Sequence, residues 1–375
     1  MASSTSHFSD IVSKFIIQGS VKEVIPWGNG NINDTYRVIN QESHAPDYIL
    51  QRVNENVFHN VEQLMENQMK VIHHVSSLAS KGSCDVSIQD SSNNNIFQPP
   101  IQRKKDLNHQ EGKKTEKTCY LYKNEKGWWR VSQFALNYQS YEQAPNVKVA
   151  KQAGGTIGSM ILALSTFQVE TLFITIPDFH NIHKRMEQLN DACSSNTAGE
   201  RTDAAQNIML KLKTNAPIFL DMYDNALSGA VPLRATHNDT KFNNMLFHPE
   251  KNVGIVIDLD TFMPGYSFFD IGDAVRSGMI SADEDEPDLE KVKLNKETYH
   301  AFLDAFVTTA KSVLTPKEIS YLPYAGAYMS FVLGVRFLTD YLNGDIYFKT
   351  KYPTHNLVRA RCQFKVCDVF LEDMS

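Results

Sequence analysis

One short stretch of the chain, HNDTKFNN from His237 to Asn244, combines residue types that fit phosphoryl transfer. A carboxylate such as that of Asp239 can orient an attacking hydroxyl group and accept its proton. A lysine such as Lys241 can neutralise a transferred phosphate, and the amide oxygen of Asn244 can bind Mg²⁺. The spacing therefore predicts a catalytic role for Asp239 and Lys241 and a metal-binding role for Asn244.

A second acidic residue follows this stretch at the end of an apolar run. Asp258, in VIDLD, comes fourteen residues after Asn244. Because Mg²⁺ takes few protein ligands and bridges them to phosphates, we expect Asp258 to be the second metal ligand. Asp260 either faces the same side and supports the metal, or is solvated or caps a helix.

Single Asn and Asp residues in loops are most often turn formers, so no one of these residues decides the function. The joint pattern is more restrictive: an apolar strand, H-x-D-x-K-x-x-N, a hairpin turned at HPEKN, and a second strand ending in Ile-Asp. D-x-K-x-x-N is also the spacing of a kinase catalytic loop. His237 is assigned to structure, as a residue that holds the loop by hydrogen bonds.

The N-terminal third of the chain predicts a sheet with one long helix. The segments VKEVIPW, TYRVIN and DYILQRV are rich in β-branched and aromatic residues and favour an antiparallel meander over residues 21–53. Apolar residues then recur at helical spacing over residues 61–80. The strands TCYLYKN and GWWRVSQFAL resume the sheet after residues 81–117, a polar segment that we interpret as a flexible surface insertion.

After Leu136 the pattern is mostly helical, and it is interrupted once, by the strands around the HNDTKFNN loop. At 375 residues the chain exceeds the usual size of one core, so two lobes with a cleft between them are expected. The predicted boundaries are a nucleotide-binding lobe at 1–136 and a catalytic, acceptor-binding lobe at 137–375.

Composition narrows the class of protein. Apolar residues make up 42% and charged residues 21% of the chain, and the formal charge is -6, so a broad basic surface for nucleic acid is not expected. No apolar run reaches the length of a membrane span, and the N-terminus lacks the pattern of a secretory signal. The cysteines are odd in number and form no C-x-x-C pair, which favours reduced thiols and a cytoplasmic location: Cys84, Cys119, Cys193, Cys362 and Cys367.

Longer strings make the resemblance specific. THNDTKFNNMLF, VIDLDTFMPGYSFFDIGDAVRS, IPDFHN, GVRFLTDYLNGDIYF and HNLVRARCQFK are similar to sequences of the aminoglycoside phosphotransferase-like (choline kinase-like) small-molecule kinases. The resemblance extends from about residue 20 to the C-terminus, except for the insertion. It implies an α+β, two-lobed protein-kinase-like fold, with an antiparallel sheet and helix in the N-lobe and a larger, mainly helical C-lobe.

The same resemblance implies ATP and Mg²⁺ as cofactors. It also implies transfer of the γ-phosphate to the anomeric hydroxyl of N-acetylglucosamine or N-acetylgalactosamine, to give the sugar 1-phosphate. By motif position, Asp239 is the base, and Asn244 and Asp258 are the metal ligands. The implied partners are these small molecules, with no nucleic acid and no membrane.

Two parts of the N-lobe are expected to hold the nucleotide. GNGNIND connects the first two strands, where Gly28 and Gly30 let the backbone approach phosphate closely. Asn31 and Asn33 can each reach phosphate or sugar, and we assign Asn31 to the nucleotide and Asn33 to the acceptor. In the third strand, the position of the usual phosphate-gripping lysine holds Gln51, with Arg52 next to it.

Strand alternation lets only one of Gln51 and Arg52 face the cleft, and the sequence leaves open which one. If Arg52 points inward, Glu66 on the following helix is its natural ion-pair partner. The alternative is that Glu66 is a solvated residue of that helix.

The acceptor-binding site is predicted from a charged residue in an otherwise apolar segment. Arg336 lies in the apolar run SFVLGVRFL, and a charged side chain is rarely buried there without a partner. The resemblance suggests that Arg336 binds sugar hydroxyls with Tyr347 beside it. Asp270 and Asp273, in FFDIGDAVR, are expected to cap the helix that begins there and to brace the catalytic loop.

Two alternatives remain. The same fold can serve another small alcohol, of the homoserine, choline or ethanolamine type, although Arg336 favours a neutral or anionic acceptor over a choline-like cation, which needs an aromatic cage. The missing strand lysine also allows a nucleotide-binding pseudokinase that acts as a scaffold. The intact set of Asp239, Lys241, Asn244 and Asp258 argues against this last hypothesis.

Overall fold

The structure, a computed structural model, describes residues 2–28, 32–80, 96–104, 120–195, 199–252 and 254–374. The chain divides into two compact units. The first contains residues 1–138 together with two later segments, 170–176 and 255–263, and the second contains the remainder. The expected boundary lay after residue 136, and the sequence did not indicate that the segment with Asp258 belongs to the first unit.

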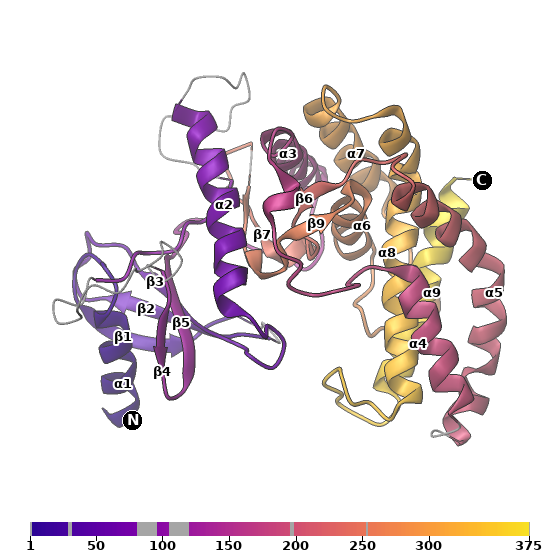
Figure 1. The fold of residues 1–375 in the computed structure, drawn as a ribbon, viewed down its shortest axis with the longest axis horizontal. Helices are drawn as coiled ribbons and strands as arrows, with labels where there is room; N and C mark the ends of the chain where they lie inside the picture. Colours follow the sequence, from indigo (N-terminus) through magenta and orange to yellow (C-terminus); the bar gives the residue numbers. More distant parts are fainter. Residues whose placement is uncertain are drawn as a thin grey trace. The chain divides into compact units, whose positions relative to one another are not determined.

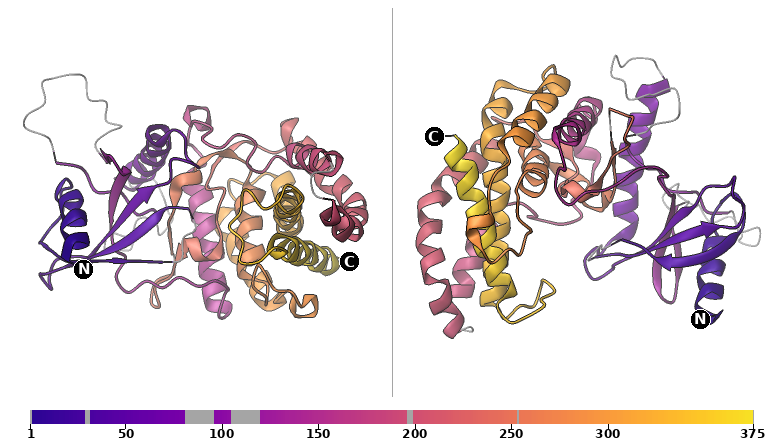
Figure 2. Two further views of the ribbon diagram at one scale, coloured as in Figure 1. Left: turned by 90° about the horizontal axis from the view of Figure 1, so that it is seen from below. Right: turned by 180° about the vertical axis from the view of Figure 1, so that it is seen from behind.

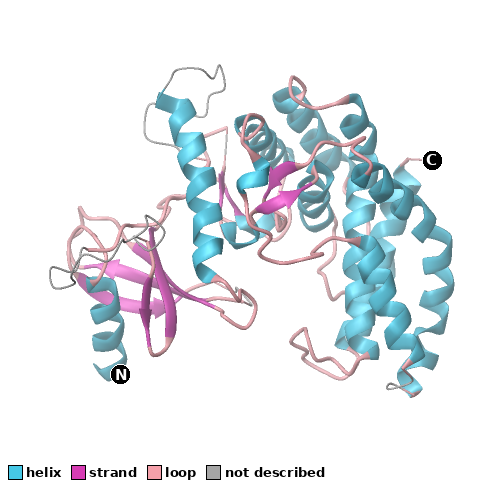
Figure 3. Ribbon diagram, viewed as in Figure 1, coloured by secondary structure: helices cyan, strands magenta, loops and turns pink. Residues whose placement is uncertain are grey.

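The first unit is built on a five-stranded sheet in the order β1-β2-β3-β5-β4, coloured magenta in Figure 3. All of its neighbouring strands are antiparallel, and β1, β2 and β3 form the predicted meander. The strands are β1 (Val21–Pro26), β2 (Asp34–Asn40), β3 (Tyr48–Val53), β4 (Tyr122–Asn124) and β5 (Gly127–Gln133). The long helix predicted over residues 61–80 is α2 (Val61–Ser80).

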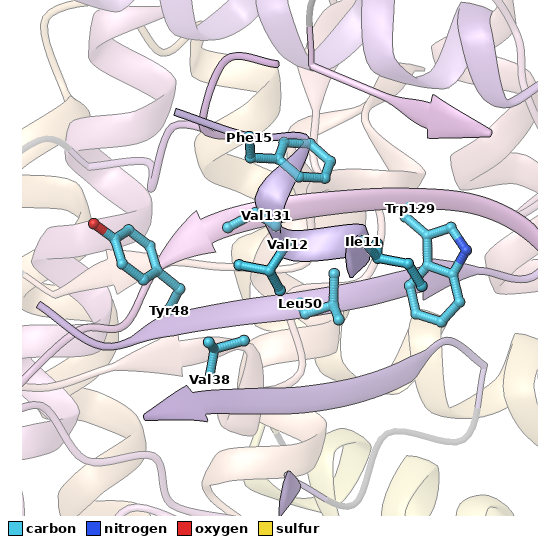
Figure 4. Close-up of a cluster of buried hydrophobic side chains, with 8 residues drawn as sticks. All are labelled: Ile11, Val12, Phe15, Val38, Tyr48, Leu50, Trp129 and Val131. Carbon is cyan, nitrogen blue, oxygen red and sulfur yellow. The ribbon is translucent and has the colours of Figure 1, made fainter. Parts of the chain in front are cut away.

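One face of this sheet is covered by α1 (Ala2–Ser13), a helix that the sequence analysis did not anticipate. Figure 4 shows Ile11, Val12 and Phe15 against side chains from three strands of the sheet: Val38, Tyr48, Leu50, Trp129 and Val131. Full burial of one such side chain contributes about 1.5–3 kcal/mol. Because side chains alternate along a strand, Gln51 and Arg130 lie on the opposite face from this core.

The segment from residue 96 to residue 104 is part of the first unit. Ile96 and Phe97 are 1% and 2% exposed, and the Phe97 ring lies edge-on to that of Phe262. Ile96 accepts a backbone hydrogen bond from Val256, and Ile101 donates one to Val131. The prediction that residues 81–117 form one flexible surface insertion is therefore wrong for this segment, because local composition does not reveal two apolar side chains that pack far along the chain. The rest of that prediction lies outside the described residues.

The second unit is mainly helical. Helices α8 and α9 lie side by side, as Figures 1 and 2 both show, and α6 also packs on α8. Helix α8 begins with a capping box in which Thr315 and Glu318 satisfy each other's backbone N–H groups. The described helices of the second unit are α3 (Val147–Ala163), α4 (Ile182–Ser194), α5 (Glu200–Leu227), α6 (Ser267–Gly278), α7 (Lys296–Ala310), α8 (Pro316–Leu342) and α9 (His355–Asp373).

Short elements flank the HNDTKFNN loop. Strand β6 (Arg234–Thr236) precedes it, and the 3-10 helix η3 (Phe242–Asn244) and strand β7 (Met245–Leu246) follow it. Further along the chain come β8 (Ile255–Val256), the 3-10 helix η4 (Leu259–Thr261) and β9 (Met263–Gly265). The remaining 3-10 helices are η2 (Val169–Thr171) and η5 (Leu289–Lys291). The fold is thus an N-terminal antiparallel sheet followed by a mostly helical region, as predicted.

Within the described ranges, none of the helices is both long enough and apolar enough to cross a membrane.

Candidate active site

The loop after β6 is held by hydrogen bonds to helix α6. The Asp270 carboxylate, in the first turn of α6, accepts hydrogen bonds from the backbone N–H groups of His237, at 3.0 Å, and Asn238, at 2.7 Å. Thr240 donates its hydroxyl to the Asp270 carbonyl oxygen at 2.5 Å. Asp270 therefore braces the loop as predicted. The expected helix cap is not formed, since the residue at the N-cap position is Tyr266 and it makes no side-chain cap.

This brace fixes an unusual backbone. Asn238 has a φ of 64°, in the left-handed region that Asn tolerates better than most residues. Its carbonyl oxygen lies 2.8 Å from Nε2 of His180, and its amide donates to the Thr236 carbonyl oxygen. The backbone N–H of Asp239 donates to Nδ1 of His237, which agrees with the structural role predicted for that histidine. The next side chain in the loop, that of Asp239, is therefore attached to a backbone held on both sides.

The three predicted side chains of the loop lie together in the second unit. Lys241 Nζ is 3.3 Å from Asp239 Oδ1. The Asn244 amide nitrogen donates to the Asp239 carbonyl oxygen, at 2.8 Å, and to its Oδ2 atom, at 3.2 Å. Because Asn244 donates through its nitrogen, its amide oxygen is the atom presented to a cation. That orientation fits a Mg²⁺ ligand.

The electrostatics of the loop keep Asp239 ionised. Burial favours the protonated form, but Lys241 and His237 outweigh it and lower the pKa of the Asp239 carboxyl below its ordinary value. The same carboxylate raises the pKa of Lys241. A charged base and a charged lysine are therefore both available at neutral pH.

The two aspartates of α6 differ from Asp239. Burial raises the pKa of Asp270 to about 6. Burial also raises the pKa of Asp273, whose Oδ1 atom is ion-paired to Arg276 at 2.6 Å and whose Oδ2 atom is buried without a hydrogen-bond partner in the described chain. Asp273 is connected to the loop through Ser277, whose hydroxyl donates to the Asp273 carbonyl and accepts from the Phe242 N–H. Sequence spacing gave no sign of Arg276 as a member of this cluster.

The predicted metal ligand Asp258 lies in the first unit. Its backbone is left-handed, with a φ of 59°, and it directly precedes η4. Two residues later, the Asp260 carboxylate is 2% exposed and accepts hydrogen bonds from three side chains, those of Asn33, Gln68 and Arg130. The alternative of a solvated Asp260 is therefore wrong.

Arg130, on β5, is the cation that sequence reasoning missed. Nη1 and Nη2 both bond to Asp260, and Nε donates to Gln51 Oε1 at 3.0 Å. Burial disfavours its charge, but Asp260 and, more weakly, Asp258 raise the pKa of the guanidinium. The available signal was the arginine itself, in the otherwise aromatic and apolar stretch GWWRV.

Gln51 and Arg52 lie on opposite faces of the sheet, and which of them faces the nucleotide stays a prediction. Gln51 pairs directly with Arg130 across β3 and β5, and its amide nitrogen donates to Thr35 Oγ1 at 3.1 Å. Arg52 lies on the other face and donates to Asp34 at 2.8 Å. Glu66 pairs with Lys70 at 3.0 Å. The conditional Arg52–Glu66 pair is therefore wrong, since Arg52 and Glu66 have other partners.

The residues predicted in the GNGNIND turn are partly described. Gly28 is exposed, with a φ of 75° and open space where a Cβ would lie. Gly30 and Asn31 lie outside the described residues. Asn33 is buried and uses both ends of its amide within the unit: it donates to Asp260 at 2.6 Å and accepts from the Asn54 N–H at 3.0 Å. These bonds give Asn33 a structural role, and its predicted contact with the acceptor stays a prediction.

Arg336 and Tyr347 are brought together in the second unit. The Arg336 guanidinium carbon lies 5.8 Å from the centre of the Tyr347 ring, and 5.2 Å and 5.4 Å from those of Phe179 and Phe348. Among the described residues, no carboxylate lies within ion-pair distance of Arg336. Its partners are thus aromatic faces, which leave its N–H groups for a ligand. Tyr347 is 64% exposed.

A second arginine and a histidine lie near this group, and the sequence analysis did not single them out. Burial and the neighbouring Arg336 lower the pKa of Arg185, on α4, to about 10. Arg185 donates to the carbonyl oxygens of Asp178 and Phe179. Burial also lowers the pKa of His180 to about 3, so its ring is neutral at neutral pH. Since His180 contacts the Asn238 carbonyl, the Arg336 group and the loop are joined through residues 179 and 180.

Comparison with known proteins agrees with this geometry. Residues 139–305 match the model of the phosphotransferase enzyme family, APH. The matched region includes the whole HNDTKFNN loop, Asp258 and helix α6.

Solved structures show the same fold at low sequence identity. An aminoglycoside phosphotransferase from Alicyclobacillus acidocaldarius is 11% identical, with a TM-score of 0.60 over 97% of this chain and 93% of that chain. A choline kinase from Cryptosporidium parvum is 13% identical, with a TM-score of 0.58 over 99% and 97% of the two chains. A spectinomycin phosphotransferase in complex with ADP and spectinomycin is 13% identical, with a TM-score of 0.53 over 98% and 97%. The fold is therefore the kinase-like fold of these proteins.

Proposed function

We propose that this protein is an ATP-dependent kinase that transfers the γ-phosphate to the anomeric hydroxyl of an N-acetylhexosamine. The acceptor is N-acetylglucosamine or N-acetylgalactosamine, and the product is the sugar 1-phosphate. The observation that carries the phosphotransfer part is the arrangement of Asp239, Lys241 and Asn244 on one braced loop. The acceptor part rests on Arg336 and on the resemblance of the sequence motifs to N-acetylhexosamine 1-kinases.

Each residue of the loop has a chemical task in this proposal. Asp239 accepts the proton of the anomeric hydroxyl, which is more acidic than an ordinary alcohol, so one positioned carboxylate is a sufficient base. Lys241 stabilises the negative charge that spreads over the transferred phosphoryl group. Because the lysine also lowers the pKa of Asp239, the base stays deprotonated until the acceptor hydroxyl approaches.

Asn244 and Asp258 are the residues that would hold Mg²⁺. The donor set fits the ion, since one amide oxygen and one carboxylate leave coordination positions for water and phosphate oxygens. Bound there with the nucleotide, Mg²⁺ would neutralise phosphate charge. The ADP complex of the spectinomycin phosphotransferase supports a nucleotide in this fold. Gly28, at the end of β1, is proposed to let the backbone approach the phosphates.

The acceptor is proposed to bind in the second unit, next to Arg336. Its guanidinium is held by three aromatic rings and has no carboxylate partner in the described chain, so it can donate to sugar oxygens. Tyr347 lies beside it with an exposed ring. A choline-like cation would be repelled by Arg336 and Arg185, which argues against the alternative suggested by the similarity to a choline kinase.

Product formation with a small panel of acceptors tests the proposal. The protein is incubated with ATP, Mg²⁺ and one acceptor at a time, and ³¹P NMR follows the product: N-acetylglucosamine, N-acetylgalactosamine, homoserine, choline or ethanolamine. A sugar 1-phosphate signal that disappears in Asp239→Asn supports the proposal. Phosphorylation of another alcohol alone would overturn the acceptor class, and nucleotide binding without any transfer would favour the pseudokinase scaffold.

A further inference from the structure

Three elements that are distant in the sequence converge on the carboxylate of Asp260 in the first unit. Arg130 comes from β5, Gln68 from α2, and Asn33 from the turn before β2. The bonds from Gln68 and Asn33 are both 2.6 Å long, and Arg130 contacts both carboxylate oxygens. All four side chains are buried.

This cluster is adjacent to a turn with a left-handed backbone at Asp258. Asp258 has left-handed φ and ψ values of 59° and 58°, which are unfavourable for a residue with a Cβ. It stands at the start of η4 without a side-chain cap. A non-glycine residue stays in this conformation only where its surroundings determine it. Two held residues lie two positions away along the chain: Val256, whose N–H donates to the Ile96 carbonyl oxygen, and Asp260, whose carboxylate is bound by Arg130.

Arg130 is bound to partners within the first unit. Each of its three nitrogens already donates, two to Asp260 and one to Gln51, and its side chain is 8% exposed. Its charge is therefore paired with that of Asp260 within the protein. Two of its five N–H groups bind Asp260 and one binds Gln51, so Arg130 holds the chain segment that carries Asp260.

We propose that Arg130 is a positioning residue, whose two-nitrogen ion pair with Asp260 holds the left-handed turn that presents the Asp258 carboxylate to Mg²⁺. This inference rests on the proposed function, since it takes Asp258 as a ligand of the metal that accompanies the nucleotide. It adds a residue from β5 that no spacing pattern links to the site. Gln68 and Asn33 support the same carboxylate.

The test is a binding measurement and needs no acceptor. Mn²⁺ is titrated into the protein with AMP-PNP, and free Mn²⁺ is followed by EPR. Because Arg130→Met alone leaves Asp260 as an uncompensated buried charge and can prevent folding, the main variant combines Arg130→Met with Asp260→Asn, which removes both charges. The matched control combines Arg37→Met with Asp47→Asn, which removes another arginine–aspartate pair of the same sheet. Arg130→Lys keeps a cation but loses the two-nitrogen contact.

We expect the Arg130/Asp260 variant to keep a melting temperature close to that of the wild type and to bind Mn²⁺ about 10- to 100-fold more weakly. Arg130→Lys should fall between the two, and the Arg37/Asp47 control should bind Mn²⁺ as the wild type does. Wild-type Mn²⁺ affinity in Arg130→Lys or in a folded Arg130/Asp260 variant would overturn the inference and leave the proposed function intact. Absence of Mn²⁺ binding with AMP-PNP in the wild type would overturn the proposed metal site and this inference together.

Discussion

Asp270 Oδ1 accepts a 2.7 Å hydrogen bond from the backbone N–H of Asn238, the residue with left-handed backbone directly before Asp239. The other oxygen of the same carboxylate holds His237. One side chain of α6 therefore sets the conformation from which the proposed base projects. A carboxylate that accepts two backbone hydrogen bonds thus orders a polar loop.

The base is tested by Asp239→Asn. The amide cannot accept a proton but keeps the size of the side chain, so transfer to the acceptor should fall by at least about a hundredfold. Nucleotide affinity and melting temperature should change little. Steady-state kinetics and a nucleotide titration measure these quantities, with Asp304→Asn, at an exposed position of α7, as the control. Turnover near the wild-type value in Asp239→Asn would rule out the assignment.

The hydrogen bonds that Asp270 accepts from the loop predict that kcat/KM depends on pH. Above about pH 6 the Asp270 carboxylate is ionised and accepts both N–H bonds, and below it protonation weakens the acceptor. We therefore expect kcat/KM to fall as the pH drops through about 6. Asp239 does not produce this limb, because its pKa is lowered below its ordinary value.

Asp270→Asn tests whether Asp270, and not Asp239, causes the fall in activity at low pH. The variant should lose the acidic limb, and its activity should be lower across the range because an amide NH₂ now faces one of the two donors. Losing a charged hydrogen bond costs about 1.5–3 kcal/mol, or roughly ten- to over a hundredfold. A pH profile of kcat/KM decides the point: the same limb in the variant would assign it to another group.

Arg336→Ala tests the acceptor site. If its guanidinium donates to sugar oxygens, the KM for N-acetylhexosamine should rise about ten- to over a hundredfold, while the KM for ATP changes little. The melting temperature should be nearly unchanged, because Arg336 has no carboxylate partner among the described residues to leave unpaired. Arg361→Ala, at an exposed position of α9, is the control. An unchanged sugar KM with a strongly lowered melting temperature would assign Arg336 to structure.

Phe97→Ala tests the segment that the sequence placed in an insertion. The ring is 2% exposed and contacts Phe262, so its removal should lower the free energy of unfolding by about 3–5 kcal/mol. Denaturant unfolding measures the change. The neighbouring Gln98→Ala, at a partly exposed position, should cost about 0.5 kcal/mol or less. Equal effects of the two changes on the free energy of unfolding would mean that residues 96–104 are a surface spacer and not part of the core.

The sequence alone predicted the loop and its surroundings because their signals are local. Asp239, Lys241 and Asn244 fall within a few positions of one another, so the spacing that allows their chemistry also brings the side chains together. The strands and α2 follow from periodicity over short windows. For the same reason, the sequence also predicted the division between a sheet-containing region and a helical region.

Only the tertiary structure decided the partners of the buried charges. The register of β3 with β5 places Gln51 opposite Arg130, a partner that strand alternation alone did not indicate. The pairing of Arg130 with Asp260, like the contact of Phe97 with Phe262, joins residues far apart in the chain. A buried charge or ring shows in the sequence only that it needs a partner, and the partner is chosen by which distant elements pack together, a property that no local pattern contains.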